Sequence, residues 1–161
     1  MSILKKEQLI SELTSYINNG YLTLDSFDDP RDEAATALCE LRSIDSSACE
    51  FFCKKILLSG DVGDPYLDGF CLGRLFDLNK EYALDYVTSH VMEMPAPVLG
   101  AAMDGLAQYS KTSFRLNFSD DLVAKIYARY DDVAKNHFSQ EIMASSYRLF
   151  VISFPRKSGY D

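Results

Sequence analysis

The sequence has no long apolar run of the kind that crosses a membrane. No stretch approaches the roughly 20 consecutive apolar residues that a membrane-spanning helix needs. Lys5, Lys6 and Glu7 stand where a secretory signal would place its apolar core. We therefore expect a soluble protein that stays in the cytoplasm and does not bind membranes.

The residues that build common catalytic sites are also scarce. His90 and His137 are the two histidines, and they do not form a ligand-spaced pair. There is no HExxH motif, no nucleophile elbow and no phosphate-binding loop ending in Gly-Lys-Ser/Thr. His90 falls on the apolar side of a predicted helix, and His137 falls in a predicted connector. Neither has an identifiable nucleophile beside it, so we expect a protein that is not an enzyme.

Four cysteines give little reason to expect a metal. Cys39, Cys49, Cys53 and Cys71 all lie within helical patterns beside apolar residues, where a free thiol packs as a small hydrophobe. Cys49 and Cys53 are four residues apart and could supply half of a metal site, but the other half is not apparent. We expect these thiols to pack in the core, with no metal and no cofactor. A helical metalloenzyme that uses the histidines, the cysteines and nearby acids is the alternative.

Basic residues are outnumbered, since 16 Lys and Arg stand against 24 Asp and Glu for a net charge of −8. This balance disfavours DNA, RNA and anionic membranes as partners. The charge is also uneven. Between Asp25 and Asp68, eleven acidic residues face four basic ones, a net of −7. Nearly all of the excess negative charge therefore lies in about a quarter of the chain.

The sequence does contain a succession of amphipathic helical patterns with short connectors. We predict one all-α domain over residues 1–161 with about eight helices. Convincing strand alternation is absent, and residues 114–118 are expected to be loop. Helix boundaries are predicted at Asn18-Asn19-Gly20, Asp29-Pro30, Asp45 or Ser46, Asp64-Pro65, Asn79, Pro97, Ser119 and Ser139.

Three of these helices share an apolar pattern. Ala37, Leu38 and Leu41 align with Cys71, Leu72 and Leu75 and then with Ala102, Met103 and Leu106, at offsets of 34 and 31 residues. A helix pair that recurs at this period is typical of stacked helical repeats. A compact helical bundle is the alternative, because ordinary helical hairpins can have the same length.

The helix pairs at 30–58, 65–91 and 97–134 resemble degenerate HEAT-type repeats. The tetratricopeptide pattern is missing, since the chain has no Trp. A short, acidic, all-helical chain is also similar to bacterial immunity proteins, which neutralise a cognate toxin. That resemblance implies an inhibitor that covers the basic active site of a nuclease-like toxin.

The stretch GDVGDPYLDG at 60–69 invites a metal or phosphate interpretation, but its spacing does not fit one. From Asp61, the calcium-loop positions fall on Gly63, Pro65 and Leu72, and a phosphate loop would need a Lys. Gly60 instead ends one helix, and Asp64-Pro65 begins the next.

Capping requires one acidic residue at each helix start. The two equivalent helix starts at Asp29-Pro30 and Asp64-Pro65 each have several acidic residues around them. We predict that they form one acidic edge that docks a basic protein. Its candidate residues are Phe27, Asp28, Asp29, Asp32, Glu33, Asp61, Asp64, Tyr66 and Asp68. A solvated edge without a partner is the plainer interpretation. An adaptor that binds a peptide or helix in a groove is a further alternative, with Tyr82, Asp85, Tyr86 and Ser89 as candidates.

Overall fold

The structure is a computed structural model that describes residues 2–59 and 64–156. Within these ranges the chain is all-helical and has no strand, which confirms the predicted fold class. The chain divides into two compact units, Met1–Lys80 (unit 1) and Glu81–Asp161 (unit 2). Whether the chain behaves as one domain stays a prediction.

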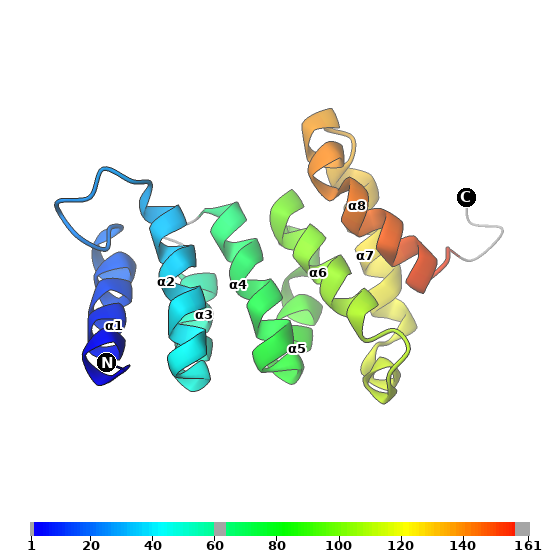
Figure 1. Ribbon diagram of the computed structural model, residues 1–161. Coiled ribbons are helices and arrows are strands. Elements are labelled where there is room, and N and C mark those ends of the chain that lie inside the picture. Colours follow the sequence, from blue (N-terminus) through cyan, green and yellow to red (C-terminus); the bar gives the residue numbers. More distant parts are fainter. Residues whose placement is uncertain (1, 60–63, 157–161) are drawn as a thin grey trace. The chain divides into compact units, whose positions relative to one another are not determined.

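Unit 1 is built from four helices. They are α1 (Ser2–Asn19), α2 (Pro30–Ile44), α3 (Ser46–Leu58) and α4 (Pro65–Leu78). Helix α2 packs against α1 and α3, and α3 packs against α4. Helices α2 and α4 also contact each other. They run in the same direction, and their first turns lie at the same end of the unit (Figure 1).

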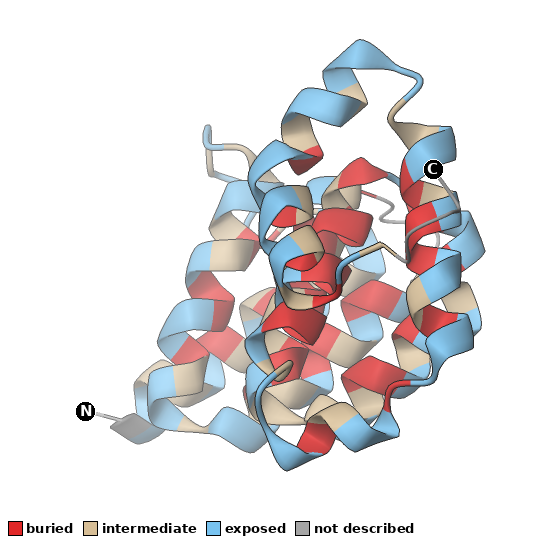
Figure 2. Ribbon diagram, turned by 90° about the vertical axis from the view of Figure 1, so that its right-hand side faces the viewer, coloured by how far each residue is buried: buried red, intermediate tan, exposed pale blue. Residues whose placement is uncertain are grey.

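Each helix of unit 1 turns one apolar face inward. Buried residues of α2 follow the spacing of one helix face, at Ala34, Ala37, Leu38 and Leu41. The aligned positions predicted from the repeat are buried in both α2 and α4. Figure 2 shows buried and exposed residues on opposite sides of the helices. The apolar pattern therefore fixes which side of each helix faces the core.

The predicted helix boundaries of unit 1 are confirmed by hydrogen bonds. Asp29, Asp45 and Asp64 each cap a helix, and their side chains accept from the backbone N–H of Arg31, Ala48 and Tyr66 respectively. Helix α1 ends at Asn19, and Gly20 follows with a φ of 84°, which suits glycine. Gly60, the predicted end of the third helix, lies outside the described residues.

Three of the four cysteines pack in the core as predicted, but Cys39 does not. Cys49, Cys53 and Cys71 are buried, whereas Cys39 is exposed. Cys39 lies on α2, outside the buried face of that helix. The apolar residue next to Cys39 in sequence therefore did not indicate whether Cys39 is buried. A hydrogen bond with Cys53, together with burial, raises the pKa of the Cys49 thiol.

We expect thiol reactivity to follow this burial pattern. The native protein should release about one equivalent of thionitrobenzoate from Ellman's reagent, through Cys39, because the reagent does not reach the three buried thiols. The denatured protein should release four, one for each cysteine. A Cys39→Ser variant is the control and should show no fast reaction. A fast reaction of that variant would contradict the buried positions.

Unit 2 contains the remaining helices. They are α5 (Lys80–His90, which begins at the boundary), the 3-10 turn η2 (Val91–Glu93), α6 (Ala96–Gln108), the 3-10 turn η3 (Ser113–Asn117), α7 (Asp120–Val133) and α8 (His137–Ser153). The most extensive packing joins α6 and α8. A Cβ at Gly100 of α6 would lie 3.4 Å from Ser146 Oγ of α8. Gly100 of α6 therefore lies against Ser146 of α8, where a Cβ would be in van der Waals contact.

Three predictions for unit 2 differ from the structure. Helix α6 begins at Ala96, with Pro95 as its N-cap, rather than at Pro97. Helix α8 begins at His137 rather than after Ser139, because Asn136 is its N-cap and accepts from the backbone N–H of Ser139 at 2.9 Å. His137 therefore lies in the first turn of α8, not in a connector. The segment predicted as loop forms the 3-10 turn η3. Both Asn and Ser are good caps, so the local signal did not choose between them.

Candidate functional site

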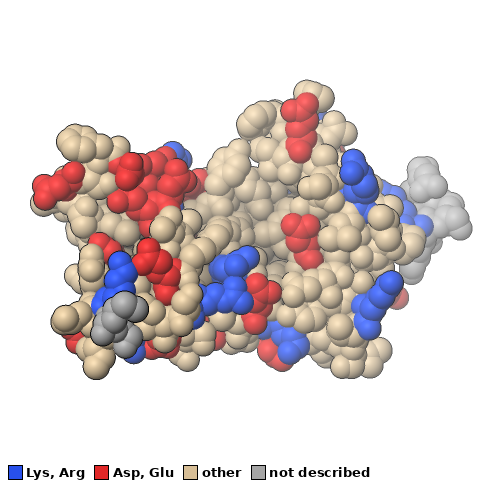
Figure 3. Space-filling model, viewed as in Figure 1, with Lys and Arg blue, Asp and Glu red and all other residues tan. Residues whose placement is uncertain are grey.

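An acidic hollow lies between α1, α2 and the loop that joins them. It has a volume of about 410 Å³. We call it the acidic hollow and define it by the six carboxylates in its lining, Glu12, Asp28, Asp29, Asp32, Glu33 and Glu40. Lys5 is the cation in the same lining, and its Nζ lies 3.2 Å from Glu40. Figure 3 shows acidic side chains gathered over this part of unit 1.

The start of α2 supplies most of these charges. Asp29 is the N-cap, and Pro30 takes the first helical position, where no backbone N–H is needed. Asp32 and Glu33 follow in the first turn, where the positive end of the helix dipole favours negative charge. Asp28 precedes the cap and is exposed. The local chemistry that begins the helix therefore also concentrates charge at this end of it.

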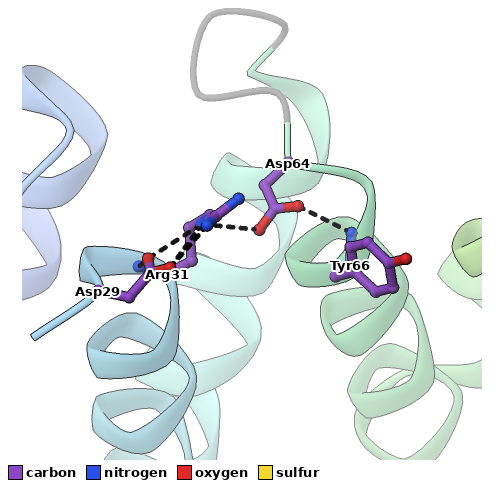
Figure 4. Close-up of polar contacts among 4 residues, drawn as sticks. All are labelled: Asp29, Arg31, Asp64 and Tyr66. Atoms are coloured by element: carbon purple, nitrogen blue, oxygen red, sulfur yellow. Dashed lines mark hydrogen bonds and ion pairs between the residues drawn. The ribbon is translucent and has the colours of Figure 1, made fainter.

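Arg31 joins the start of α2 to the start of α4 (Figure 4). Its guanidinium donates to both carboxylate oxygens of Asp29, with Nη2 to Oδ2 at 2.6 Å. Its Nε also lies 3.5 Å from Asp64 Oδ2. The two helix starts are thus side by side, as the repeat predicted. A cation sits between them, which the sequence did not show.

Asp29 and Asp64 are engaged in these internal contacts. Hydrogen bonds from Arg31 lower the pKa of Asp29 to about 2. Asp64 has only 8% of its side chain exposed and also accepts from the Tyr66 N–H at 3.1 Å. These two carboxylates therefore hold the helix starts together, and Asp64 has little surface left for a partner.

Asp68 of α4 is half-buried. Burial, and then the nearby carboxylate of Asp64, raise the pKa of Asp68 to about 6. The phenol of Tyr16 is 2% exposed, and its pKa is raised by burial and then by Asp64. Asp68 thus belongs to a partly buried group of polar side chains behind the acidic edge.

The predicted partner-binding residues therefore fall into separate groups. Those that present surface to solvent are Phe27, Asp28, Asp32, Glu33 and Tyr66, although Glu33 is half-buried. Asp29 and Asp64 serve internal contacts, Asp68 is half-buried, and Asp61 lies outside the described residues. Glu12 and Glu40 were missed because their place in the hollow depends on how α1 packs against α2.

The alternative groove residues all lie on α5. Asp85 and Ser89 are exposed, while Tyr82 and Tyr86 are half-buried. The ring of Tyr86 stacks on His90 with centroids 4.2 Å apart, and His90 Nδ1 is hydrogen-bonded to the Tyr86 carbonyl oxygen at 2.9 Å. His90 is thus a satisfied, partly buried side chain, as predicted. His137 is 82% exposed, with its Nε2 3.0 Å from Glu141.

A second hollow, of about 570 Å³, lies in unit 2 between α7 and residues 153–156. Arg156 is paired there with Asp131, donates to the Tyr147 hydroxyl and lies over the Tyr127 ring. Arg115 lies over the Phe154 ring and donates to the Phe118 carbonyl oxygen. Most of the charge in this lining is thus tied to neighbouring side chains.

Across residues 2–59 and 64–156, no three His, Cys, Asp or Glu residues are grouped so that they could hold a metal ion. None of the described helices combines the length and the apolar character needed to cross a membrane.

A scan of protein-family models and a search of curated proteins found no match to this chain. The resemblances to HEAT-type repeats and to immunity proteins therefore stay predictions.

Proposed function

We propose that this chain is a non-catalytic protein-binding module and that its acidic hollow docks a basic protein. The observation that supports this function is the lining of the hollow, which holds six carboxylates. Arg31 pairs with Asp29 and Lys5 pairs with Glu40, so the excess negative charge lies on Glu12, Asp28, Asp32 and Glu33. This excess attracts a cationic partner. Complementary charge also steers association and selects among partners.

The carboxylates that line the hollow suit Lys and Arg side chains in particular. Both residues carry their charge on a long apolar stem, which lets the charged group reach into a hollow while its backbone stays outside. An Arg can also pair with a carboxylate through two parallel hydrogen bonds. Asp28 and Asp32 are exposed and free to take part in such pairs at the mouth of the hollow.

The most specific form of this proposal is an immunity protein that inhibits a cognate toxin. In this form the carboxylates take the place of nucleic-acid phosphates and cover the basic active site of a nuclease-like toxin. The small size, the net charge of −8 and the all-helical fold support it.

Neutralising the exposed acids tests the proposal. In the triple variant Asp28→Asn, Asp32→Asn, Glu33→Gln, the N-cap Asp29 is kept, so α2 should still begin at Pro30. We expect the affinity for a basic partner to fall by about tenfold or more, and its dependence on salt to weaken. The partner is retrieved by pull-down, identified by mass spectrometry, purified and titrated by calorimetry at two ionic strengths.

A matched control carries the same change in net charge elsewhere. The variant Asp85→Asn, Asp121→Asn, Glu141→Gln removes three exposed acids of unit 2 and should bind as the wild type does. Retrieval of no partner, or of acidic partners only, would contradict the proposal. An affinity that ignores ionic strength would also contradict it. Loss of binding in the control variant alone would favour the α5 groove, because Asp85 belongs to that surface.

A further inference from the structure

The loop between α1 and α2 holds two large apolar side chains out into solvent. Leu24 is 82% exposed and Phe27 is 105% exposed, as much as in an extended peptide. Leu22 in the same loop is 7% exposed, so the loop does bury an apolar side chain where it contacts the core. Single exposed apolar residues are common, but these two are three residues apart, and Phe27 directly precedes Asp28, which lines the acidic hollow.

Both ends of this loop are fixed. At its start, Gly20 N–H donates to the Tyr16 carbonyl oxygen at 2.8 Å, and the Ser15 hydroxyl donates to the carbonyl oxygen of Tyr21 at the same distance. At its end, Asp29 caps α2 by accepting from the Arg31 backbone N–H at 2.9 Å, and within the loop Asp28 N–H donates to Ser26 Oγ at 3.1 Å. A side chain presented from an anchored loop loses less conformational freedom on binding than one on a free tail.

Phe27 is an exposed aromatic residue with acidic residues beside it in sequence, a combination that suits a binding hot spot. Hot spots are enriched in aromatic residues that fill a pocket on the partner, inside a rim of polar or charged residues. Asp25 and Asp28 flank Phe27 in sequence, and Asp28 also lines the acidic hollow. The apolar side chains and the carboxylates thus lie close together in the chain. A partner that binds both has to present an apolar surface beside basic residues.

We propose that Leu24 and Phe27 are the apolar anchor of the docking surface and that the partner is a folded protein with an apolar pocket ringed by Lys and Arg. This inference rests on the proposed function and narrows it. An unstructured basic chain could neutralise the carboxylates, but it has no preformed pocket that removes Phe27 from water. Charge would then set the association rate, and burial of the anchor would set the lifetime of the complex.

The test compares the wild type, the anchor variant Leu24→Ser, Phe27→Ser and the acid-neutralised triple variant as baits. A control variant, Leu116→Ser, Ile152→Ser, removes two apolar side chains of unit 2 that are 88% and 73% exposed. The captured protein is identified, purified and titrated against each variant. Poly-L-lysine serves as a probe that offers charge without a pocket.

We expect the anchor variant to bind the purified partner about tenfold or more weakly, through faster dissociation, with an unchanged salt dependence. It should bind poly-L-lysine as the wild type does, and the control variant should match the wild type on both ligands. Wild-type affinity of the anchor variant for the partner, combined with a loss in the acid-neutralised variant, would overturn this inference and leave the proposed function standing. Capture of an unfolded basic chain as the partner would also overturn this inference and leave the proposed function standing. Wild-type affinity of both variants, or the capture of no basic protein, would overturn both.

Discussion

Replacing Phe150 by Ala is expected to lower the free energy of unfolding by about 3–5 kcal/mol. Phe150 of α8 is 0% exposed, and its ring lies 5.2 Å from that of Tyr127 and 4.9 Å from that of Phe154, between centroids. Removing the ring leaves a cavity. Because whole domains are stable by about 5–15 kcal/mol, this one substitution should remove a large share of the total.

Urea denaturation followed by circular dichroism measures this effect. Leu149→Ala is the matched control, since Leu149 precedes Phe150 on the same helix but is 45% exposed. Surface substitutions of this kind usually change stability by about 0.5 kcal/mol or less. Equal shifts of the denaturation midpoint in the two variants would show that Phe150 is not at the centre of unit 2.

Replacing Asp68 by Asn is expected to stabilise the protein at pH 7. Burial and the neighbouring Asp64 carboxylate raise the pKa of Asp68 from 3.8 to about 6, so the folded state disfavours its ionised form. At pH 7 Asp68 is ionised in both states, and the folded protein bears the full cost. The pKa difference alone corresponds to about 3 kcal/mol for ionising Asp68 in the folded state. Because the half-buried side chain is still screened by water, we expect a cost on the order of 1–2 kcal/mol.

The pH dependence gives this prediction its own control. Between about pH 4 and pH 6 the folded state binds more protons at Asp68 than the unfolded state, so this group lowers stability as the pH rises through that window. Below pH 4 the carboxyl is protonated in both states, and the advantage of the Asn variant should disappear. Thermal unfolding of both proteins from pH 4 to pH 7 checks this. A variant that is less stable than the wild type at pH 7 would contradict the buried placement of Asp68.

Local rules were enough to predict most of the fold. The caps at Asp29, Asp45 and Asp64 depend on residues within one turn of the helix start, and the structure places all three as expected. The aligned apolar positions are buried in α2, α4 and α6, because a helix of regular period presents the same face wherever the pattern repeats. Where two good caps lie three residues apart, as Asn136 and Ser139 do, the same rules did not decide.

The candidate site could be predicted only in part, because its details depend on contacts between helices. Arg31 reaches Asp64 across 33 positions of sequence (64 − 31), and nothing near Arg31 in the chain indicates that pairing. Glu12 enters the acidic hollow through the packing of α1 on α2, and Asp68 is drawn inward by the position of α4. The sequence therefore showed where acidic residues accumulate, while the packing decides which of them reach solvent.

The exposed thiol of Cys39 offers a natural attachment point for a fluorescent reporter. Cys39 directly precedes Glu40, which lines the acidic hollow, and the other three cysteines are buried. A maleimide dye would thus label the unmodified native chain at a single position, beside the surface where the partner is expected. A change in dye emission would report occupancy of the hollow in real time, with every charged and apolar residue of the docking surface left in place.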